Sequence, residues 1–113
     1  MQINNIMVIS PAGQIDQQTG EQLDTYLKNL VSKGNRKLIL DFKNVDFTNS
    51  EGLRVLLGSL KQTRSEGGDI FLANVSPLIN NILITTGFSN LLKIFTDIDS
   101  ALINFQSVHK NEN

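Results

Sequence analysis

Cysteine is absent from this chain of 113 residues, and histidine occurs once, as His109 near the end. Without cysteine, the chain has no disulfides, thiolate zinc sites or cysteine nucleophiles. Net charge is also small, because 10 Lys and Arg face 11 Asp and Glu, which gives −1. Tight binding to nucleic acid or to anionic lipid needs clustered cations, so neither is expected as a direct partner.

Long hydrophobic runs are missing as well. No apolar segment approaches the roughly 18 to 20 residues of a membrane span. A signal peptide begins with a basic region followed by an apolar run, and residues 1–5 show no such pattern. We therefore expect a soluble, cytoplasmic protein. With 40% hydrophobic residues, a chain of this length can bury one core and form one domain.

Short apolar segments alternate with amphipathic ones along the chain. Four are predicted strands: residues 6–9, 38–40, 70–72 and 94–95. Four are predicted helices: residues 17–33, 50–66, 77–86 and 98–105. Residues 13–16 are predicted to form a turn after the first strand, and Leu78 is assigned to the apolar face of the third helix. Strands separated by helices need crossover connections, which predict an α/β fold with a small, mixed, mostly parallel sheet and about four helices. Residues 1–105 are assigned to this domain and residues 106–113 to a polar tail.

Ser50, at the junction between the second predicted strand and its helix, is the most informative residue. A serine at a helix start usually caps it by accepting a backbone N–H. Thr48 followed by Glu51 also fits the spacing of a capping box, which would release Ser50 from that role. The same position suits a phosphate, since the free N–H groups and the helix dipole favour an anion. These residues alone favour a cap, with a phosphorylation switch as the alternative.

Catalysis by Ser50 is a third interpretation. The window from Thr48 to Gly52 resembles the nucleophile elbow G-x-S-x-G, with Thr48 in place of the first glycine. Activating a serine normally needs a positioned His or Lys, and His109 is the only histidine. No P-loop, GxGxxG or metal-ligand spacing is present. The sequence therefore predicts a protein that is not an enzyme and has no catalytic residues, metal site or cofactor.

Four stretches of the chain resemble the STAS family, the domain of anti-sigma factor antagonists and of sulfate-transporter tails. They are residues 13–16 with Thr19, residues 38–42 with Val45 and Phe47, residues 49–53, and residues 67–77 with Thr86, Gly87 and Phe88. Residues 49–53 are similar to the D-S-S-G-L switch motif of the family. The resemblance spans about residues 6–105 and implies a single STAS-like domain.

The resemblance also implies a partner switch. Stand-alone bacterial members bind an anti-sigma factor that is itself a serine kinase, and so release the sigma factor. The kinase phosphorylates the first serine of the motif, here Ser50, binding is lost, and a metal-dependent serine phosphatase reverses the reaction. The implied partner-binding residues are Asp16, Thr48, Asn49, Ser50, Glu51 and Gly52.

Two residues depart from the family motif. Asn49 stands where the family usually has Asp, which removes a negative charge beside the serine. Glu51 stands where a second Ser is frequent, which restores one negative charge.

Two further functions stay open from the sequence. One is a STAS interaction module in a larger signalling or lipid-transport complex, in which Ser50 is not phosphorylated and is only structural. The other is a serine hydrolase.

Overall fold

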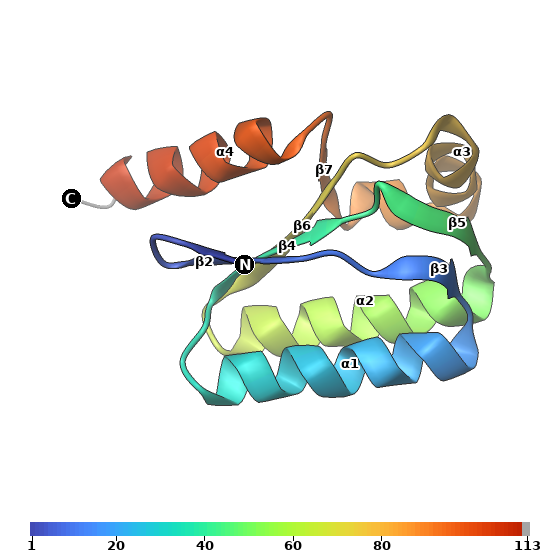
Figure 1. The fold of residues 1–113 in the computed structure, drawn as a ribbon, viewed down its shortest axis with the longest axis horizontal. Coiled ribbons are helices and arrows are strands. Elements are labelled where there is room, and N and C mark those ends of the chain that lie inside the picture. The colour runs from blue at the N-terminus through green and yellow to red at the C-terminus, as the bar shows by residue number, and fades with distance from the viewer. Residues whose placement is uncertain (112–113) are drawn as a thin grey trace.

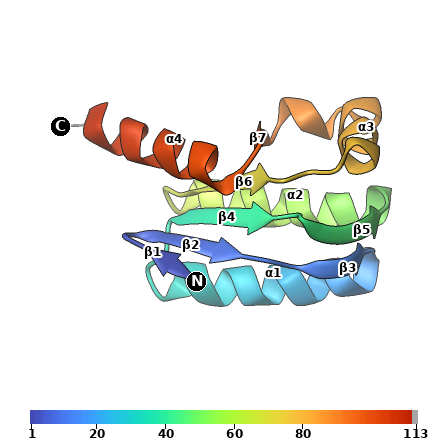
Figure 2. The same cartoon turned by 45° about the horizontal axis from the view of Figure 1, so that its top comes forward.

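The apolar segments of the sequence form a central sheet of five strands (Figures 1 and 2). The computed structural model describes the backbone of residues 1–111 and the side chains of residues 1–106. Strand order is β1-β2-β4-β6-β7, with β1 antiparallel to β2 and the other neighbours parallel. The bounds are β1 (Gln2–Ile3), β2 (Ile6–Ile9), β4 (Lys37–Asp41), β6 (Asp69–Ala73) and β7 (Lys93–Phe95). The predicted mixed, mostly parallel sheet is confirmed.

A second, two-stranded sheet extends from the first. β3 (Ala12–Ile15) follows β2, β5 (Asn44–Thr48) follows β4, and the two strands pair in parallel. The predicted turn over residues 13–16 is therefore wrong. Gly13 has a φ of 81°, and the pairing register shifts between Gly13 and Gln14. A bulge uses the same conformational freedom of glycine as a turn does, but the strand continues after it.

The described backbone contains four α-helices, in agreement with the prediction. They are α1 (Gln17–Ser32), α2 (Ser50–Ser65), α3 (Pro77–Thr86) and α4 (Ile98–Asn111), with a short 3-10 helix η1 (Phe88–Asn90) after α3. α3 has the predicted signals, since Ser76 caps it and Gly87 ends it with a φ of 82°. α4 continues to Asn111, beyond residue 106, where the sequence predicts a tail to begin. The side chain of His109 lies outside the described residues. Among the helices that the structure describes, none has the length and hydropathy of a membrane span.

Helices cover both faces of the central sheet. In Figure 1, α1 and α2 lie on one side of the strands and α4 on the other. β4 is consequently buried on both faces: Leu38 and Leu40 join the core that includes α1 and α2, while Ile39 joins the core that includes α4. Burial on both faces is the reason that this strand is a continuous apolar run. On the α4 side, the ring of Phe105 stacks on Phe71 with centroids 3.7 Å apart.

Two glycines allow a close approach between the first turns of α1 and α2. A Cβ added to Gly52 would collide with the carbonyl oxygen of Ile15 and would lie 3.0 Å from the Cα of Asp16. A Cβ added to Gly20 of α1 would lie 3.4 Å from the carbonyl oxygen of Gly52. The backbone at the start of α2 therefore rests directly on the end of β3, and no side chain fits between them.

Gly52→Ala tests this backbone contact. We expect it to lower the free energy of unfolding by about 1–3 kcal/mol or more, because the added methyl group meets rigid backbone. Gly58→Ala is the matched control on the same helix, since its added Cβ has no neighbour within 4 Å. That substitution should raise the stability by roughly 0.5–1 kcal/mol through its helix propensity. Urea denaturation measures both, and a Gly52→Ala protein as stable as the wild type would contradict the contact.

Candidate functional site

The parallel ends of β3 and β5 bring the candidate residues together. Ile15 and Thr48, the last residues of the two strands, are register partners. The hydroxyl of Thr48 donates to the carbonyl oxygen of Ile15 at 2.9 Å, and Thr48 is only 1% exposed. α1 and α2 begin immediately after these strands, at the same end of the molecule (Figure 1). All six predicted partner-binding residues therefore lie at this end.

Asn49 caps α2. Its Oδ1 accepts the backbone N–H of Gly52 at 2.9 Å, and its carbonyl oxygen accepts the N–H of Leu53 at 3.0 Å. The two predicted caps, Thr48 and Ser50, are therefore wrong. Thr48 is committed to the buried bond with β3, and the capping position falls one residue later. Thr, Asn and Ser are all good N-caps, so local sequence does not choose among them.

Asp16 caps α1 and carries a fixed charge. Its Oδ1 accepts the backbone N–H of Thr19 at 3.0 Å, and its own N–H donates to the Thr19 hydroxyl at 2.9 Å. The Thr19 N–H, followed by the Thr19 hydroxyl, lowers the pKa of Asp16 below its ordinary value of 3.8, since both bonds favour the carboxylate. Asp16 is thus ionised at neutral pH. Asn49 supplies the equivalent acceptor on α2 without a charge.

Ser50 is the first residue of α2 and is exposed to solvent. Because Asn49 is the cap, the Ser50 hydroxyl has no capping role, and none of the hydrogen bonds found among the described side chains involves it. No His or Lys there is hydrogen-bonded to it, as an activated nucleophile requires. The described residues thus present an accessible hydroxyl that can receive a group from an enzyme.

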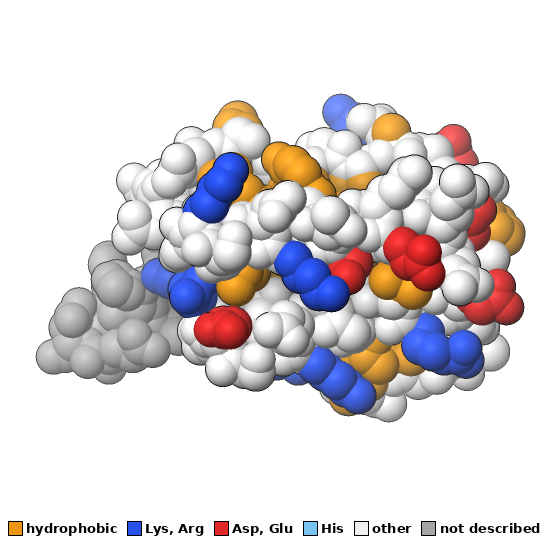
Figure 3. All heavy atoms as spheres, turned by 90° about the horizontal axis from the view of Figure 1, so that it is seen from below, with side chains coloured by type: hydrophobic (Ala, Val, Ile, Leu, Met, Phe, Trp, Pro, Cys, Tyr) orange, Lys and Arg blue, Asp and Glu red, His pale blue; other side chains and the backbone are white. Residues whose placement is uncertain are grey.

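Carboxylates surround this end of the molecule. Asp46 on β5 and Glu51 on α2 are exposed, as is Glu21 on α1. In Figure 3, most of the visible Asp and Glu side chains lie in the half where α1 and α2 begin. A new negative charge at Ser50 would therefore be added to a surface that carries several carboxylates together with the exposed Arg54 of α2.

Two exposed apolar residues at this end are missed by the sequence analysis. Phe47 on β5 is 46% exposed, and Leu78 at the start of α3 is 60% exposed. Figures 1 and 2 both place β5 and α3 at the end where α2 begins. The assignment of Leu78 to the buried face is wrong, because Ile79 and Leu83, four residues apart, define that face. Exposed apolar side chains beside polar ones are common in protein contacts.

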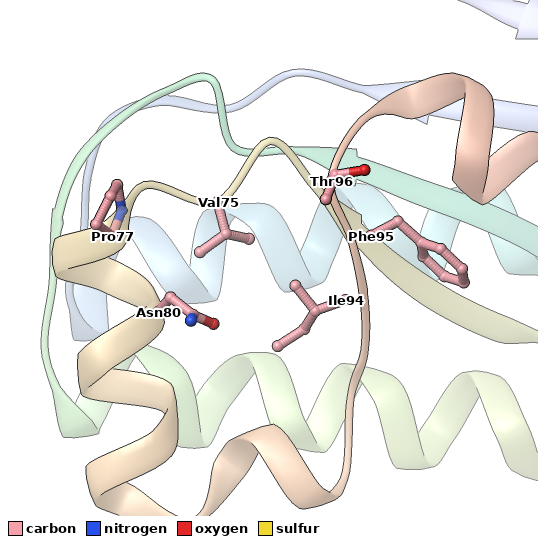
Figure 4. A pocket seen from close by; sticks show the side chains of 6 residues that line it. All are labelled: Val75, Pro77, Asn80, Ile94, Phe95 and Thr96. Atoms are coloured by element: carbon pink, nitrogen blue, oxygen red, sulfur yellow. The ribbon is translucent and has the colours of Figure 1, made fainter.

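A pocket of about 470 Å³ lies between α3 and β7 (Figure 4). It is lined by Val75, Pro77, Asn80, Ile94, Phe95 and Thr96. This lining offers no acid, base or charged group. No cluster of three or more His, Cys, Asp or Glu that could hold a metal exists among the described residues. The pocket therefore supplies no side chain suited to acid–base catalysis, and Ser50 remains the candidate that the sequence singles out.

Known proteins are similar to this chain in sequence and in fold. The STAS domain family model matches residues 1–101. BtrV of Bordetella bronchiseptica, provisionally assigned as an anti-sigma factor antagonist, is 28% identical over 105 residues, which cover 93% of this chain and 90% of BtrV. The anti-sigma F factor antagonist of Paenibacillus polymyxa is 23% identical over 104 residues, which cover 91% of this chain and 89% of that antagonist. The Bacillus cell fate determinant SpoIIAA, solved in its phosphorylated form, aligns with a TM-score of 0.68 and 22% identity, covering 93% of this chain and 95% of SpoIIAA.

The likeness to SpoIIAA shows that the two chains share a fold, in which a mixed sheet is covered by helices on both faces. The family match includes both strand ends, both caps and Ser50. This chain belongs to the STAS domain family.

Proposed function

We propose that this protein is a cytoplasmic anti-sigma factor antagonist whose binding to an anti-sigma factor is controlled by reversible phosphorylation of Ser50. The observation that carries the proposal is the exposed Ser50 hydroxyl, which stands next to the cap of α2 without being part of it. Two relatives named as anti-sigma factor antagonists support the first half of the proposal. A STAS-like fold solved in a phosphorylated form supports the second half.

The six predicted partner-binding residues divide by exposure. Ser50 and Glu51 are exposed, and Asp16 and Asn49 are half-buried, so these four can contact a partner directly. Thr48 and Gly52 are buried. We assign them a positioning role, because one fixes the end of β5 and the other allows α2 to rest on β3.

Phosphorylation replaces a small neutral hydroxyl by a bulky anion of about −1.5 to −2 charges. A partner surface that excludes water around the hydroxyl cannot accommodate this group without leaving charge unpaired or opening a gap. The anti-sigma factor itself, acting as a serine kinase, would add the phosphate, and a metal-dependent serine phosphatase would remove it. This protein then acts as a regulator of transcription through protein binding and performs no chemistry itself.

Ser50→Ala tests the acceptor site. With ATP, magnesium and the cognate kinase, the wild-type protein should gain one phosphate and Ser50→Ala none, as measured by intact mass. Ser65→Ala is the matched control, since Ser65 is an exposed serine at the other end of the same helix. It should be phosphorylated like the wild type. Equal phosphorylation of Ser50→Ala would place the modification on another residue.

Ser50→Asp and Ser50→Asn separate charge from size. The two side chains have nearly the same volume, but only Asp is ionised. We expect Ser50→Asp to bind the anti-sigma factor at least tenfold more weakly, a change of about 1.4 kcal/mol, and Ser50→Asn to lie close to the wild type. Calorimetric titration of the two purified proteins gives both affinities. If Asn weakens binding as much as Asp does, exclusion by size and not by charge controls the contact.

Phe47→Ala tests whether the contact surface extends onto β5. Phe47 is partly exposed, so its truncation should change stability little but weaken binding to the anti-sigma factor by about 1–2 kcal/mol, as for an aromatic interface residue. Ile103→Ala is the control, because Ile103 is 61% exposed on α4. It should leave the affinity unchanged. Unchanged affinity of Phe47→Ala would confine the contact surface to the helix starts.

A further inference from the structure

The start of α2 presents three polar side chains together: Ser50 and Glu51 in the first turn, and Arg54 at the beginning of the second. All three are exposed. Arg54 follows Ser50 by four residues and Glu51 by three, and helical residues at these spacings are neighbours on one face. Side chains on a helix lean toward its N-terminus. The long guanidinium of Arg54 can therefore reach back over the turn that carries Ser50.

Within the described part of the chain, the guanidinium of Arg54 forms no ion pair, and the backbone N–H groups of Ser50 and Glu51 donate no hydrogen bond. The two ion pairs found there are Lys28 with Asp24 and Arg64 with Asp69. The cap residue takes the backbone N–H groups of Gly52 and Leu53. No hydrogen bond among the described residues uses the N–H of Ser50 or of Glu51, as expected for the first positions of a helix.

We propose that Arg54 is the internal counter-ion of phosphorylated Ser50, an inference that rests on the proposed modification of Ser50. The phosphate places about −1.5 to −2 charges beside Glu51. Arginine stays protonated and offers a fork of N–H donors that matches two phosphate oxygens. Part of the charge on the phosphate is thereby offset within the same helix.

Arg54 is the cation on α2 that lies nearest to Ser50 in the sequence. Close to this turn, the other charged groups are the carboxylates Asp16, Glu21 and Asp46, and Lys43 lies before the opposite end of β5. Farther along the two helices, Asp24 on α1 pairs with Lys28, Arg64 on α2 pairs with Asp69, and Lys61 is exposed on α2. Modification therefore changes two groups at once. Ser50 becomes a dianion, and Arg54, which Glu51 can attract in the unmodified protein, turns to the phosphate. A partner loses access to the hydroxyl and to the guanidinium in one step.

The test measures the second pKa of the phosphate directly. Phosphoserine is incorporated at position 50 during synthesis in an expression host, so that no kinase is needed, and its ³¹P NMR signal is titrated from pH 4 to pH 8. An arginine close to the dianion favours the dianionic form. Removing it by Arg54→Gln should raise the pKa of the phosphate by about 0.5–1 at low ionic strength. The difference should shrink at 1 M salt, where the Debye length is about 3 Å.

Lys61→Gln is the matched control, because it removes one exposed cation from the same helix about three turns away. It should leave the pKa of the phosphate unchanged. Arg54→Lys keeps the charge and loses the fork, and should give an intermediate value. Equal pKa values in the wild type and Arg54→Gln would overturn the inference. Because the phosphate is placed without an enzyme, this outcome is independent of whether a kinase modifies Ser50 or a partner responds to it.

Discussion

The contact between the backbone of Gly52 and the end of β3 is the constraint on which the candidate site depends. It sets α2 directly against Ile15 and Asp16, where a single methyl group would not fit. The buried bond from Thr48 to Ile15 holds the two strand ends in the same relation. Since both helices start at once after these strands, the two contacts fix both helix starts together, and with them the place of Ser50 on the surface.

This rigidity suits a switch that acts through surface chemistry. The caps of α1 and α2 are complete without Ser50, so the hydroxyl can change its chemical state while the helices keep their ends. The neutral amide of Asn49 serves as well as the Asp that the family usually has, since an N-cap needs only an acceptor. The negative charge that the family usually has at the position of Asn49 is carried here by Glu51, the second residue of α2. The helix dipole still favours a negative charge at that position.

Those parts of the fold that depend on local signals are predicted from the sequence. The run from Leu38 to Leu40 shows a strand buried on both faces, and Ser76 with Pro77 shows where α3 begins. The parts that were not predicted depend on contacts between distant segments. β3 and β5 are short, and β5 has few apolar residues, so their pairing is not visible in either segment alone. The choice of Asn49 as the cap is settled by the carbonyl oxygen of Ile15, which engages Thr48. Family resemblance, and not local physics, pointed to Ser50 as more than a cap.

Ser50 stands on the first turn of a folded helix, and that turn is positioned by a bond between residues 33 apart in the chain. Under the proposed function, an enzyme that modifies this serine meets it on a folded surface built from two chain segments. Those two segments are brought together only in the native state. Unfolded copies of the protein, and short peptides cut from around the serine, lack that surface.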